Sequence, residues 1–316
     1  MSEPLHRTSS GASSKFQEHG ERCILPPVTL SVVIITHNEE ANFTRTLESV
    51  QSLVSGGKGE IIVVDSGSTD RTVEIAKSFG AKIFIEEWKG YAAQKNSAID
   101  KATGDWILSL DADEEVSVDL AAHIERAAFD RDYGPFEWAL ASAFTTKFED
   151  LRGDVGLLPL AFWITRKNYF LGRWLEHGGY YPDRKLRLFA RGSARFDESR
   201  AVHEDAHTNR KTAVVKVGAL LHHSYPTLTD YIDHMNRYSS LGAEMVVAKA
   251  DGKMHFSVVN IVLRPLATFV YNYFFRLGFL DGREGLLLHL YHAVYVSWKY
   301  SKAWELSHKR TGQMSS

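Results

Sequence analysis

The chain has 316 residues, of which 44% are hydrophobic, so it can bury one large α/β core together with a smaller appended unit. Its 37 Lys and Arg against 39 Asp and Glu give a formal net charge of −2, which argues against a nucleic acid as the main partner. The one cysteine, Cys23, excludes an internal disulfide and a cysteine-based metal cluster, and it agrees with a reducing, cytoplasmic compartment.

The first 28 residues are rich in Ser, Gly, Glu and His, contain few apolar side chains, and show neither helical nor strand periodicity. This composition predicts a disordered tail over residues 1–28. The stretch also lacks the apolar run of about 7 to 15 residues that a secretory signal needs. We therefore expect the chain to begin in the cytosol.

Apolar strands and helix-like segments alternate over the next stretch of the chain. The β-branched run TLSVVIITHN, which begins at Thr29, is typical of a strand buried on both faces, and residues 39–52 follow with nearly helical spacing. A second strand, EIIVVD, leads to a helix over 71–79, and AKIFIEE is a third strand. This alternation predicts a parallel, doubly wound sheet whose ligands bind at the carboxyl ends of the strands.

Polar side chains follow the first two strands where these end. They are Thr36, His37, Asn38 and Glu39 after the first strand, and Asp65, Ser66, Ser68, Thr69 and Asp70 after the second. Capping of the following helix explains most of them about as well as ligand binding does. Asp65 ends a buried strand, so its carboxylate must face a helix terminus or the ribose or base of a ligand, and we favour the ligand.

The strongest signal is Asp111-Ala112-Asp113, which directly follows a fourth apolar strand in GDWILSLDADEEV. Two carboxylates separated by one small residue face the same solvent space, and Mg²⁺ or Mn²⁺ prefers such oxygen ligands together with substrate phosphates. The alternative is an acidic turn in which Glu114 and Glu115 favour a helix N-terminus. Because two other strands with polar ends precede this one, we favour the metal site.

Four segments, SVVIITHNEE, IIVVDSGSTDRT, GYAAQKNSAI and GDWILSLDADEE, together resemble a family 2 nucleotide-sugar glycosyltransferase with the GT-A fold, over about residues 30 to 116. The resemblance implies that Asp65 contacts the uracil or ribose and that Lys95 helps to hold the nucleotide, as an ammonium beside a diphosphate would. It implies that Asp111 contacts the ribose or the metal and that Asp113 is the main metal ligand. It further implies a nucleoside pocket lined by Thr36, His37, Asn38 and Glu39.

Downstream, WITRKNYFLGRWLEHGGYYPDRKLRLFARGSARFDESRAVHEDAH resembles the lipopolysaccharide-core β-1,4-glucosyltransferase group, in a less specific match that extends to about residue 305. This implies inverting transfer from a nucleotide-sugar, expected to be a UDP-hexose, to a membrane-associated glycolipid or lipopolysaccharide-core acceptor. Processive members of the family carry a Q-x-x-R-W motif. Here Arg173 and Trp174 are present, but Phe170 occupies the glutamine position, so we expect transfer of a single sugar.

An inverting transfer needs a base that removes the proton of the acceptor hydroxyl. The segment AVHEDAH supplies Glu204 and Asp205, and the resemblance places the base in this region; we favour Glu204, with Asp205 second. His203 is a candidate to complete the metal shell, against the commoner role of a surface or hydrogen-bonded histidine. A basic run nearby suits an anionic acceptor and ordinary solvation of a strand face equally. It comprises Arg184, Lys185, Arg187, Arg191 and Arg195.

The last third of the chain, from residue 223 on, holds long aromatic and aliphatic stretches. Charged residues interrupt each stretch well before the ~20 residues that a membrane-spanning helix needs. Residues 253–310 contain eight Lys or Arg against three Asp or Glu, a local excess of +5. Such segments suit helices that lie in the interface of an anionic membrane. A helical cap packed on the catalytic domain or on a second subunit is the alternative.

We therefore expect a tail over 1–28, a GT-A domain over 29–222 and a helical membrane-interface or packing extension over 223–316. The domain would comprise a nucleotide-binding half, 29–116, and an acceptor half, 117–222, and the protein would lie peripherally on the inner face of the cell membrane. An NAD-dependent enzyme and a P-loop nucleotidase are disfavoured because neither G-x-G-x-x-G after a strand nor G-x-x-x-x-G-K-[ST] occurs. A non-catalytic sensor or scaffold that binds a sugar nucleotide remains the alternative function.

Overall fold

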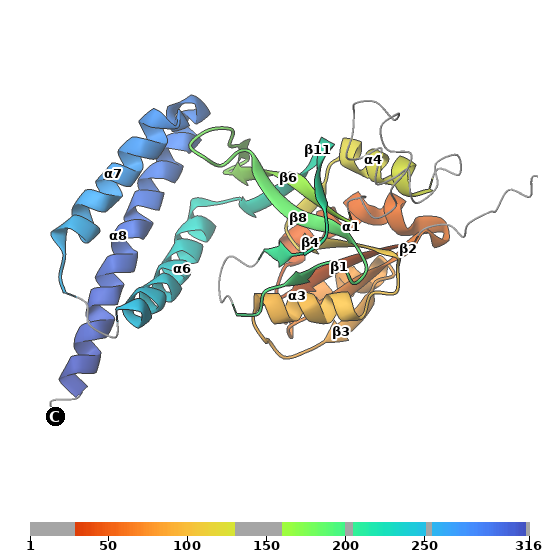
Figure 1. Ribbon diagram of the computed structural model, residues 1–316, viewed down its shortest axis with the longest axis horizontal. Helices are drawn as coiled ribbons and strands as arrows, with labels where there is room; N and C mark the ends of the chain where they lie inside the picture. The colour runs from red at the N-terminus through yellow and green to blue at the C-terminus, as the bar shows by residue number, and fades with distance from the viewer. Residues whose placement is uncertain (1–28, 130–159, 200–204, 251–254, 314–316) are drawn as a thin grey trace, which may run out of the picture.

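The computed structural model describes residues 29–129, 160–199, 205–250 and 255–313. A mostly parallel sheet with helices on both faces forms one part of the molecule, and three long helices lie beside one end of it (Figure 1). The predicted α/β class, with a Rossmann-like sheet and a helical, aromatic-rich C-terminal extension, is confirmed.

The first strands form the parallel half of the sheet. They are β1 (Leu30–Thr36), β2 (Gly59–Asp65), β3 (Lys82–Ile85) and β4 (Trp106–Asp111). Strand β1 pairs with β2 on one side and with β4 on the other, and β3 pairs with β2, all in parallel. The register places Thr36 beside Asp65 and Ile35 beside Asp111. The polar residues that end these strands therefore meet at one edge, as parallel strands require.

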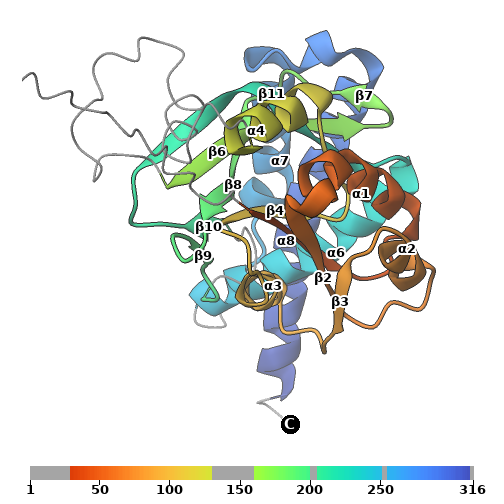
Figure 2. The same cartoon turned by 90° about the vertical axis from the view of Figure 1, so that its right-hand side faces the viewer.

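Helices cover both faces of this half because the strands are apolar on both faces. They are α1 (Glu40–Val54), α2 (Thr72–Ser78), α3 (Tyr91–Asp100) and α4 (Val118–Phe129). In β1, Val32 and Ile34 pack with buried side chains of α1, α2 and α4, whereas Val33 packs with those of α3. Figure 2 shows α3 on the opposite side of the strands from α1 and α4. The unbroken apolar run thus marks a strand buried on both faces, as predicted.

The other half of the sheet departs from the predicted doubly wound pattern. Strand β8 (Asp183–Ala190) lies between β4 and β6 (Ala161–Phe170) and is antiparallel to both. Strand β11 (Thr212–Tyr225) runs parallel to β6, and β5 (Glu114–Val116) is antiparallel to β11. The strand order is β3-β2-β1-β4-β8-β6-β11-β5. The apolar periodicity of a segment indicates a strand but not its direction or its neighbours.

Two short pairings complete the strands. Strand β7 (Arg173–Trp174) forms a hairpin with the end of β6, and β9 (Arg195–Phe196) pairs with β10 (Ala206–His207). Strand β7 follows a turn at the end of β6, whereas β9 follows the turn at the opposite edge of the sheet, where β8 ends beside the start of β4. The β6–β7 pairing fixes the chain that leads into β8, and the β9–β10 pairing fixes the chain that follows β8.

The C-terminal helices begin after β11. Helix α6 (Leu228–Lys249) starts at a capping box made by Thr227 and Asp230. Helix α7 (Arg264–Val270) lies between two π-helical turns, Val259–Leu263 and Tyr271–Phe275. A 3₁₀ turn, Gly278–Asp281, leads into α8 (Gly282–Gln313), against which both α6 and α7 pack. Within the described ranges, no helix combines the length and apolar character that crossing a bilayer requires.

Candidate active site

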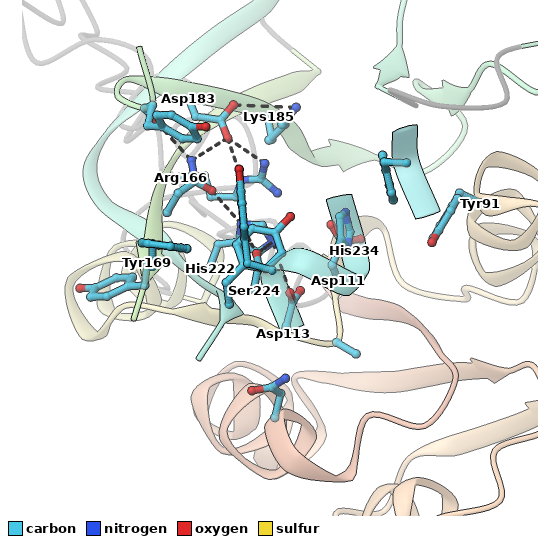
Figure 3. A pocket seen from close by; sticks show the side chains of 18 of the residues that line it. Tyr91, Asp111, Asp113, Arg166, Tyr169, Asp183, Lys185, His222, Ser224 and His234 are labelled. Atoms are coloured by element: carbon cyan, nitrogen blue, oxygen red, sulfur yellow. Dashed lines mark hydrogen bonds and ion pairs between the residues drawn. The ribbon is translucent and has the colours of Figure 1, made fainter. Parts of the chain in front are cut away.

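A cavity of about 1160 Å³ opens where the carboxyl ends of β1 and β4 meet β6, β8, β11, α6 and α8 (Figure 3). Its lining brings together seven of the residues predicted to bind the nucleotide or the metal or to act as the base. They are Thr36, His37, Glu39, Lys95, Asp111, Asp113 and Asp205. The cavity also takes side chains that the sequence did not single out, among them Arg166, Asp183, His222 and His234. The predicted nucleotide side therefore faces residues from the distant second half of the chain.

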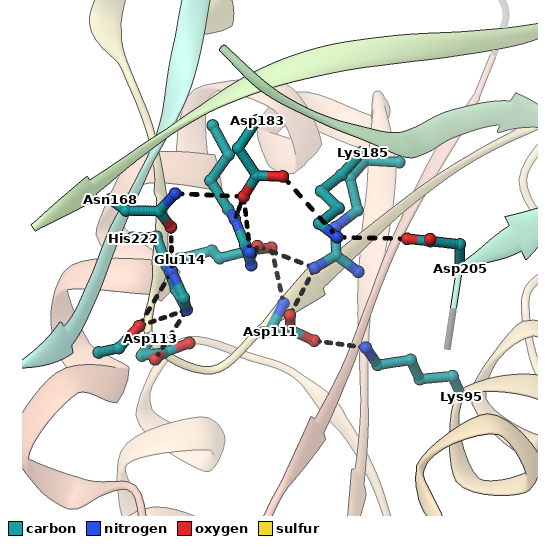
Figure 4. Close-up of polar contacts among 12 residues, drawn as sticks. Lys95, Asp111, Asp113, Glu114, Asn168, Asp183, Lys185, Asp205 and His222 are labelled. Carbon is teal, nitrogen blue, oxygen red and sulfur yellow. Dashed lines mark hydrogen bonds and ion pairs between the residues drawn. The ribbon is translucent and has the colours of Figure 1, made fainter. Parts of the chain in front are cut away.

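Buried carboxylates and cations form one side of this cavity (Figure 4). Glu114, fully buried, accepts hydrogen bonds from Arg187 at 2.8 Å and from Arg166 at 3.1 Å. Arg187 also donates to Asp111, and Lys95 Nζ lies 2.7 Å from Asp111 Oδ1. Burial alone would raise the pKa of Asp111, but Arg187 and Lys95 outweigh it and hold that pKa well below its usual value. Asp111 is therefore an anion whose charge two neighbouring cations already compensate.

The other aspartate of the motif meets a histidine. Asp113 Oδ2 lies 3.3 Å from His222 Nε2, and the backbone N–H of His223 donates to the Asp113 carbonyl at 3.1 Å. The opposite ring nitrogen of His222 lies 2.7 Å from Asn168 Oδ1, which orients the imidazole. Burial raises the pKa of Asp113, yet the charge and hydrogen bond of His222 bring it below the usual value. Strand β11 thus presents an imidazole to the acidic motif.

Asp65 and Asn38 organise the turns at the strand ends. The fully buried Asp65 carboxylate accepts hydrogen bonds from Thr36 Oγ1 at 2.8 Å and from the backbone N–H groups of Gly67 at 2.9 Å and Ser68 at 2.8 Å. Asn38 has a positive φ of 55°, and its Oδ1 accepts from the Thr69 N–H at 2.8 Å. Both side chains bind neighbouring loops in this structure. The nucleoside contacts predicted for them stay predictions.

Glu39 lines the cavity, and the pKa of its carboxyl group is raised. Burial, and then the negative charge of Asp113, raise its pKa to about 7. Its backbone N–H donates to Thr72 Oγ1 at 2.8 Å, which fixes the chain at the entry to α1. The neighbouring His37 is exposed at the rim of the cavity. These two residues remain candidates to contact a nucleoside.

The two candidate bases directly precede β10 in the sequence. Asp205 is described, and its Oδ1 lies 3.3 Å from Lys185 Nζ at the edge of the cavity. Lys185 Nζ is also 3.8 Å from Asp183. Glu204 and His203 lie outside the described residues. The structure thus places one of the two candidate bases at the cavity and says nothing of the other.

The basic run of the sequence divides between two surroundings. Arg184, Lys185 and Arg187 line the cavity from β8, whereas Arg195 pairs with the exposed Asp100 away from it. Arg187 is buried beneath the acidic motif, where it is committed to Asp111 and Glu114. Arg184 and Lys185 are therefore placed where they can bind an anionic ligand. Solvation or structural ion pairs account for the other described residues of the basic run.

Hydrogen bonds join the loop after β7 to the turn that precedes α8. The carboxylate of Asp281, 2% exposed, accepts hydrogen bonds from the backbone N–H groups of Glu176 at 3.2 Å and His177 at 2.9 Å. It also lies 2.9 Å from Nδ1 of His177, and the Gly178 N–H donates to the Arg276 carbonyl at 2.8 Å. This loop contributes cavity-lining residues, namely Leu175, Gly179, Tyr180 and Pro182. The C-terminal helices therefore help to shape the cavity.

Comparisons with known proteins find similarity to glycosyltransferases. Residues 31–150 match the family model described as "Glycosyl transferase family 2". The lipopolysaccharide core biosynthesis glycosyltransferase LpsC of Rhizobium meliloti is similar, at 29% identity over 271 residues, which span 82% of this chain and 84% of LpsC. An uncharacterized glycosyltransferase of Rickettsia typhi is 47% identical over 96 residues, 30% of this chain and 32% of that protein.

Solved structures show a weaker likeness over most of the chain. A mannosyltransferase from Pyrobaculum calidifontis, in complex with GDP-Man and Mn²⁺, aligns with a TM-score of 0.48 and 15% identity, over 89% of this chain and 88% of that one. The 1–349 fragment of S. aureus TarS in complex with UDP aligns with a TM-score of 0.42 and 17% identity, over 90% and 92%.

Proposed function

We propose that this chain, a glycosyltransferase whose residues 31–150 form a family 2 domain, moves one sugar from a UDP-hexose to a lipopolysaccharide-core or related glycolipid acceptor with inversion at the anomeric carbon. One observation carries the proposal: Asp111 and Asp113 face a cavity whose same side holds Lys95 and Arg187. Its volume of about 1160 Å³ exceeds that of an ordinary small-molecule pocket, so a donor and part of an acceptor fit together.

A divalent cation, Mg²⁺ or Mn²⁺, fits beside Asp113. Since Lys95 and Arg187 already compensate Asp111, the carboxylate of Asp113 and the imidazole of His222 are the adjacent donor groups best placed to hold it. Among the described residues no three such side chains form a ready-made cluster, so donor phosphate oxygens would complete the shell. When bound there, the cation would neutralise charge on the departing diphosphate. His203 keeps its predicted place in the shell as part of the proposal.

The chain's own groups would do the rest of the chemistry. Lys95 approaches the acidic motif from α3 and would stabilise the phosphates as a point charge. A carboxylate, Glu204 first and Asp205 second, would take the proton of the acceptor hydroxyl. The acceptor oxygen then bonds to the anomeric carbon as the bond from that carbon to the diphosphate breaks. Asp205 lies at the cavity edge, which supports this region as the source of the base.

A glycolipid acceptor implies contact with a membrane, and an exposed apolar surface on the C-terminal helices suits that contact. We name it the apolar ridge; its most exposed member, Phe275, is 75% exposed. It comprises Val258, Val259, Val262, Leu263, Leu266, Tyr271, Phe274, Phe275, Leu277, Phe279 and Leu280. With the local excess of positive charge, such a surface favours peripheral binding to the anionic inner face of the cell membrane.

Vesicle flotation tests the ridge. The wild-type chain should float with phosphatidylcholine vesicles increasingly as phosphatidylglycerol is added, and less in high salt. The double change Phe274→Asp and Phe275→Asp should weaken binding by at least about tenfold, because two aromatic anchors are lost. Val118→Asp is the matched control, since Val118 is 84% exposed on α4, far from the ridge. Equal binding by the ridge variant and the control would refute this contact.

Turnover separates the enzyme from the alternative, a non-catalytic sensor or scaffold. The purified protein would be incubated with UDP-hexoses and Mn²⁺, and the release of UDP would be measured. The reaction would be run with and without lipopolysaccharide extracted from cells that lack this protein. We expect release that depends on the lipopolysaccharide. A protein that is stabilised by donor, by about 2.7 kcal/mol at 100 times the dissociation constant, yet releases no UDP in either mixture would be the sensor instead.

A further inference from the structure

One wall of the cavity is built of rings. The ring of Phe170, at the end of β6, meets Tyr231 at a centroid distance of 5.2 Å, and Tyr231 meets Tyr225 at 4.9 Å. Tyr225 contacts His234 at 5.3 Å, and His234 stacks on Tyr238 at 4.1 Å with 18° between the planes. All five residues line the cavity. We name this row the ring wall; it leads from the buried end of the sheet outward along α6.

The acidic motif acts on the middle of the ring wall. The charge of Asp113 reaches both Tyr225 and His234. Burial, followed by the charge of Arg237, lowers the pKa of His234 to about 4, against the opposing effect of Asp113. The imidazole is therefore neutral at neutral pH. Next to this wall, α8, which packs on α6, adds lining from Leu288, His292 and Tyr295. A ligand along this wall meets uncharged rings, with the exposed Arg237 at its outer end.

The two sides of the cavity suit different parts of the reactants. A diphosphate belongs with Lys95 and the acidic motif, where the fixed charges are. The ring wall offers flat apolar faces together with the phenol hydroxyls of Tyr225 and Tyr238 and a neutral imidazole. Such a surface fits a pyranose, whose C–H face packs on aromatic rings while its hydroxyls reach polar tips. A lipid chain would offer those polar groups no hydrogen bond.

We infer that the ring wall is the subsite for the terminal neutral sugars of the acceptor, with the stacked pair His234 and Tyr238 as its contact surface. The inference rests on the proposed function and adds where the acceptor saccharide lies. It places the sugar that receives the new bond near Asp113, because the charge of that carboxylate reaches Tyr225 and His234 in the wall. The remaining acceptor sugars would then extend along α6 toward the opening of the cavity.

Calorimetric titration with two probes tests the subsite. One probe is UDP; the other is the oligosaccharide released by mild acid from lipopolysaccharide of cells that lack this protein, titrated into protein saturated with UDP. In Tyr238→Ala the dissociation constant for the oligosaccharide should rise about tenfold through loss of a stacked ring, with that for UDP unchanged. Tyr238→Phe keeps the ring and should stay within about twofold of wild type. Tyr300→Ala is the matched control, because Tyr300 is a partly exposed helical tyrosine outside both the cavity lining and the apolar ridge.

Each outcome decides the matter. Unchanged oligosaccharide binding in Tyr238→Ala, or equal weakening of both probes, overturns the ring-wall subsite. Wild-type protein that binds UDP and releases it from donor, yet does not bind the oligosaccharide, also overturns it while leaving the donor side of the proposed function intact. Failure to bind or turn over any donor would instead count against the proposed function. If circular dichroism shows that Tyr238→Ala is unfolded, Tyr238→Leu keeps the helix and apolar contacts and should show the same tenfold rise.

Discussion

The two walls of the cavity differ in how their side chains are held. On the charged wall, Asp111, Glu114 and Arg187 come from strands and a tight turn, and each is fixed by at least two polar partners. On the ring wall, His234 and Tyr238 lie on one face of a helix, are partly exposed, and stack on each other. Under the proposed function, the charged wall would be a rigid donor site that preorganises charge, and the ring wall a more adaptable surface that selects the acceptor.

The largest effect is expected on the charged wall, at Asp113. Asp113→Ala removes the carboxylate nearest His222 without disturbing the buried pairs of Asp111. Transfer should fall by about 10³-fold or more, the order seen when a transition-state charge partner is lost, while the fold is kept. Initial rates with UDP-hexose, with and without EDTA, provide the measurement. A variant with near wild-type rates, or wild-type activity that EDTA leaves unchanged, would rule out the metal role.

The base should give the next effect. Glu204→Gln keeps the shape of the side chain but cannot take a proton, so kcat should drop by about 10²-fold or more with donor binding retained. Asp205→Asn is the matched control, and it also removes the charge of one of the two carboxylates near Lys185, the other being Asp183. A dead Asp205 variant beside an active Glu204 variant would reverse the assignment. Full activity in both would place the base elsewhere.

Stability should separate the two walls. Arg187→Met leaves the fully buried Glu114 with Arg166 as its remaining side-chain cation and should cost about 3 to 5 kcal/mol of the free energy of unfolding. Tyr238→Ala removes a partly exposed ring and should cost about 1 kcal/mol. Urea unfolding at neutral pH measures both. Equal losses would contradict the contrast between a rigid charged wall and an adaptable ring wall.

The sequence predicts the residues at the ends of the first strands better than those that the second half of the chain brings to the cavity. Thr36, Asp111 and Asp113 could be placed because each ends or follows an apolar strand that the local pattern predicts, whereas Lys95 came from the family resemblance alone. His222 could not, because the pairing of β11 that brings it to Asp113 depends on the antiparallel insertion of β8, which no local period encodes.

Charged residues in the second half of the chain show why local patterns were insufficient. Arg166 interrupts an apolar strand, which hints at a buried partner, but its partners Glu114 and Asp183 come from other strands. In the sequence, Asp281 is one of the charged residues that interrupt the apolar stretches, whereas in the structure its carboxylate accepts hydrogen bonds from the backbone of Glu176 and His177. In both cases the sequence gives the residue type and the fold supplies the partner.

The smallest effect concerns pH. The pKa of Glu39 is raised to about 7 by burial and by Asp113, so between its ordinary value of 4.5 and about 7 the folded state holds a proton that the unfolded state has released. Stability should therefore fall as the pH rises through this window, and Glu39→Gln should remove that fall. In EDTA, the variant should melt higher than wild type at about pH 8, with the difference vanishing near pH 4.5. A constant difference across this range would contradict the raised pKa.

The most direct test of the account is product analysis. The full-length protein would be incubated with ¹³C-labelled UDP-hexoses and with lipopolysaccharide from cells that lack this protein. The product would be examined by mass spectrometry and by NMR of the new anomeric carbon. The account predicts the gain of one hexose with a β linkage from an α-linked donor. Addition of several hexoses, a retained α configuration, or donor breakdown without transfer would contradict it.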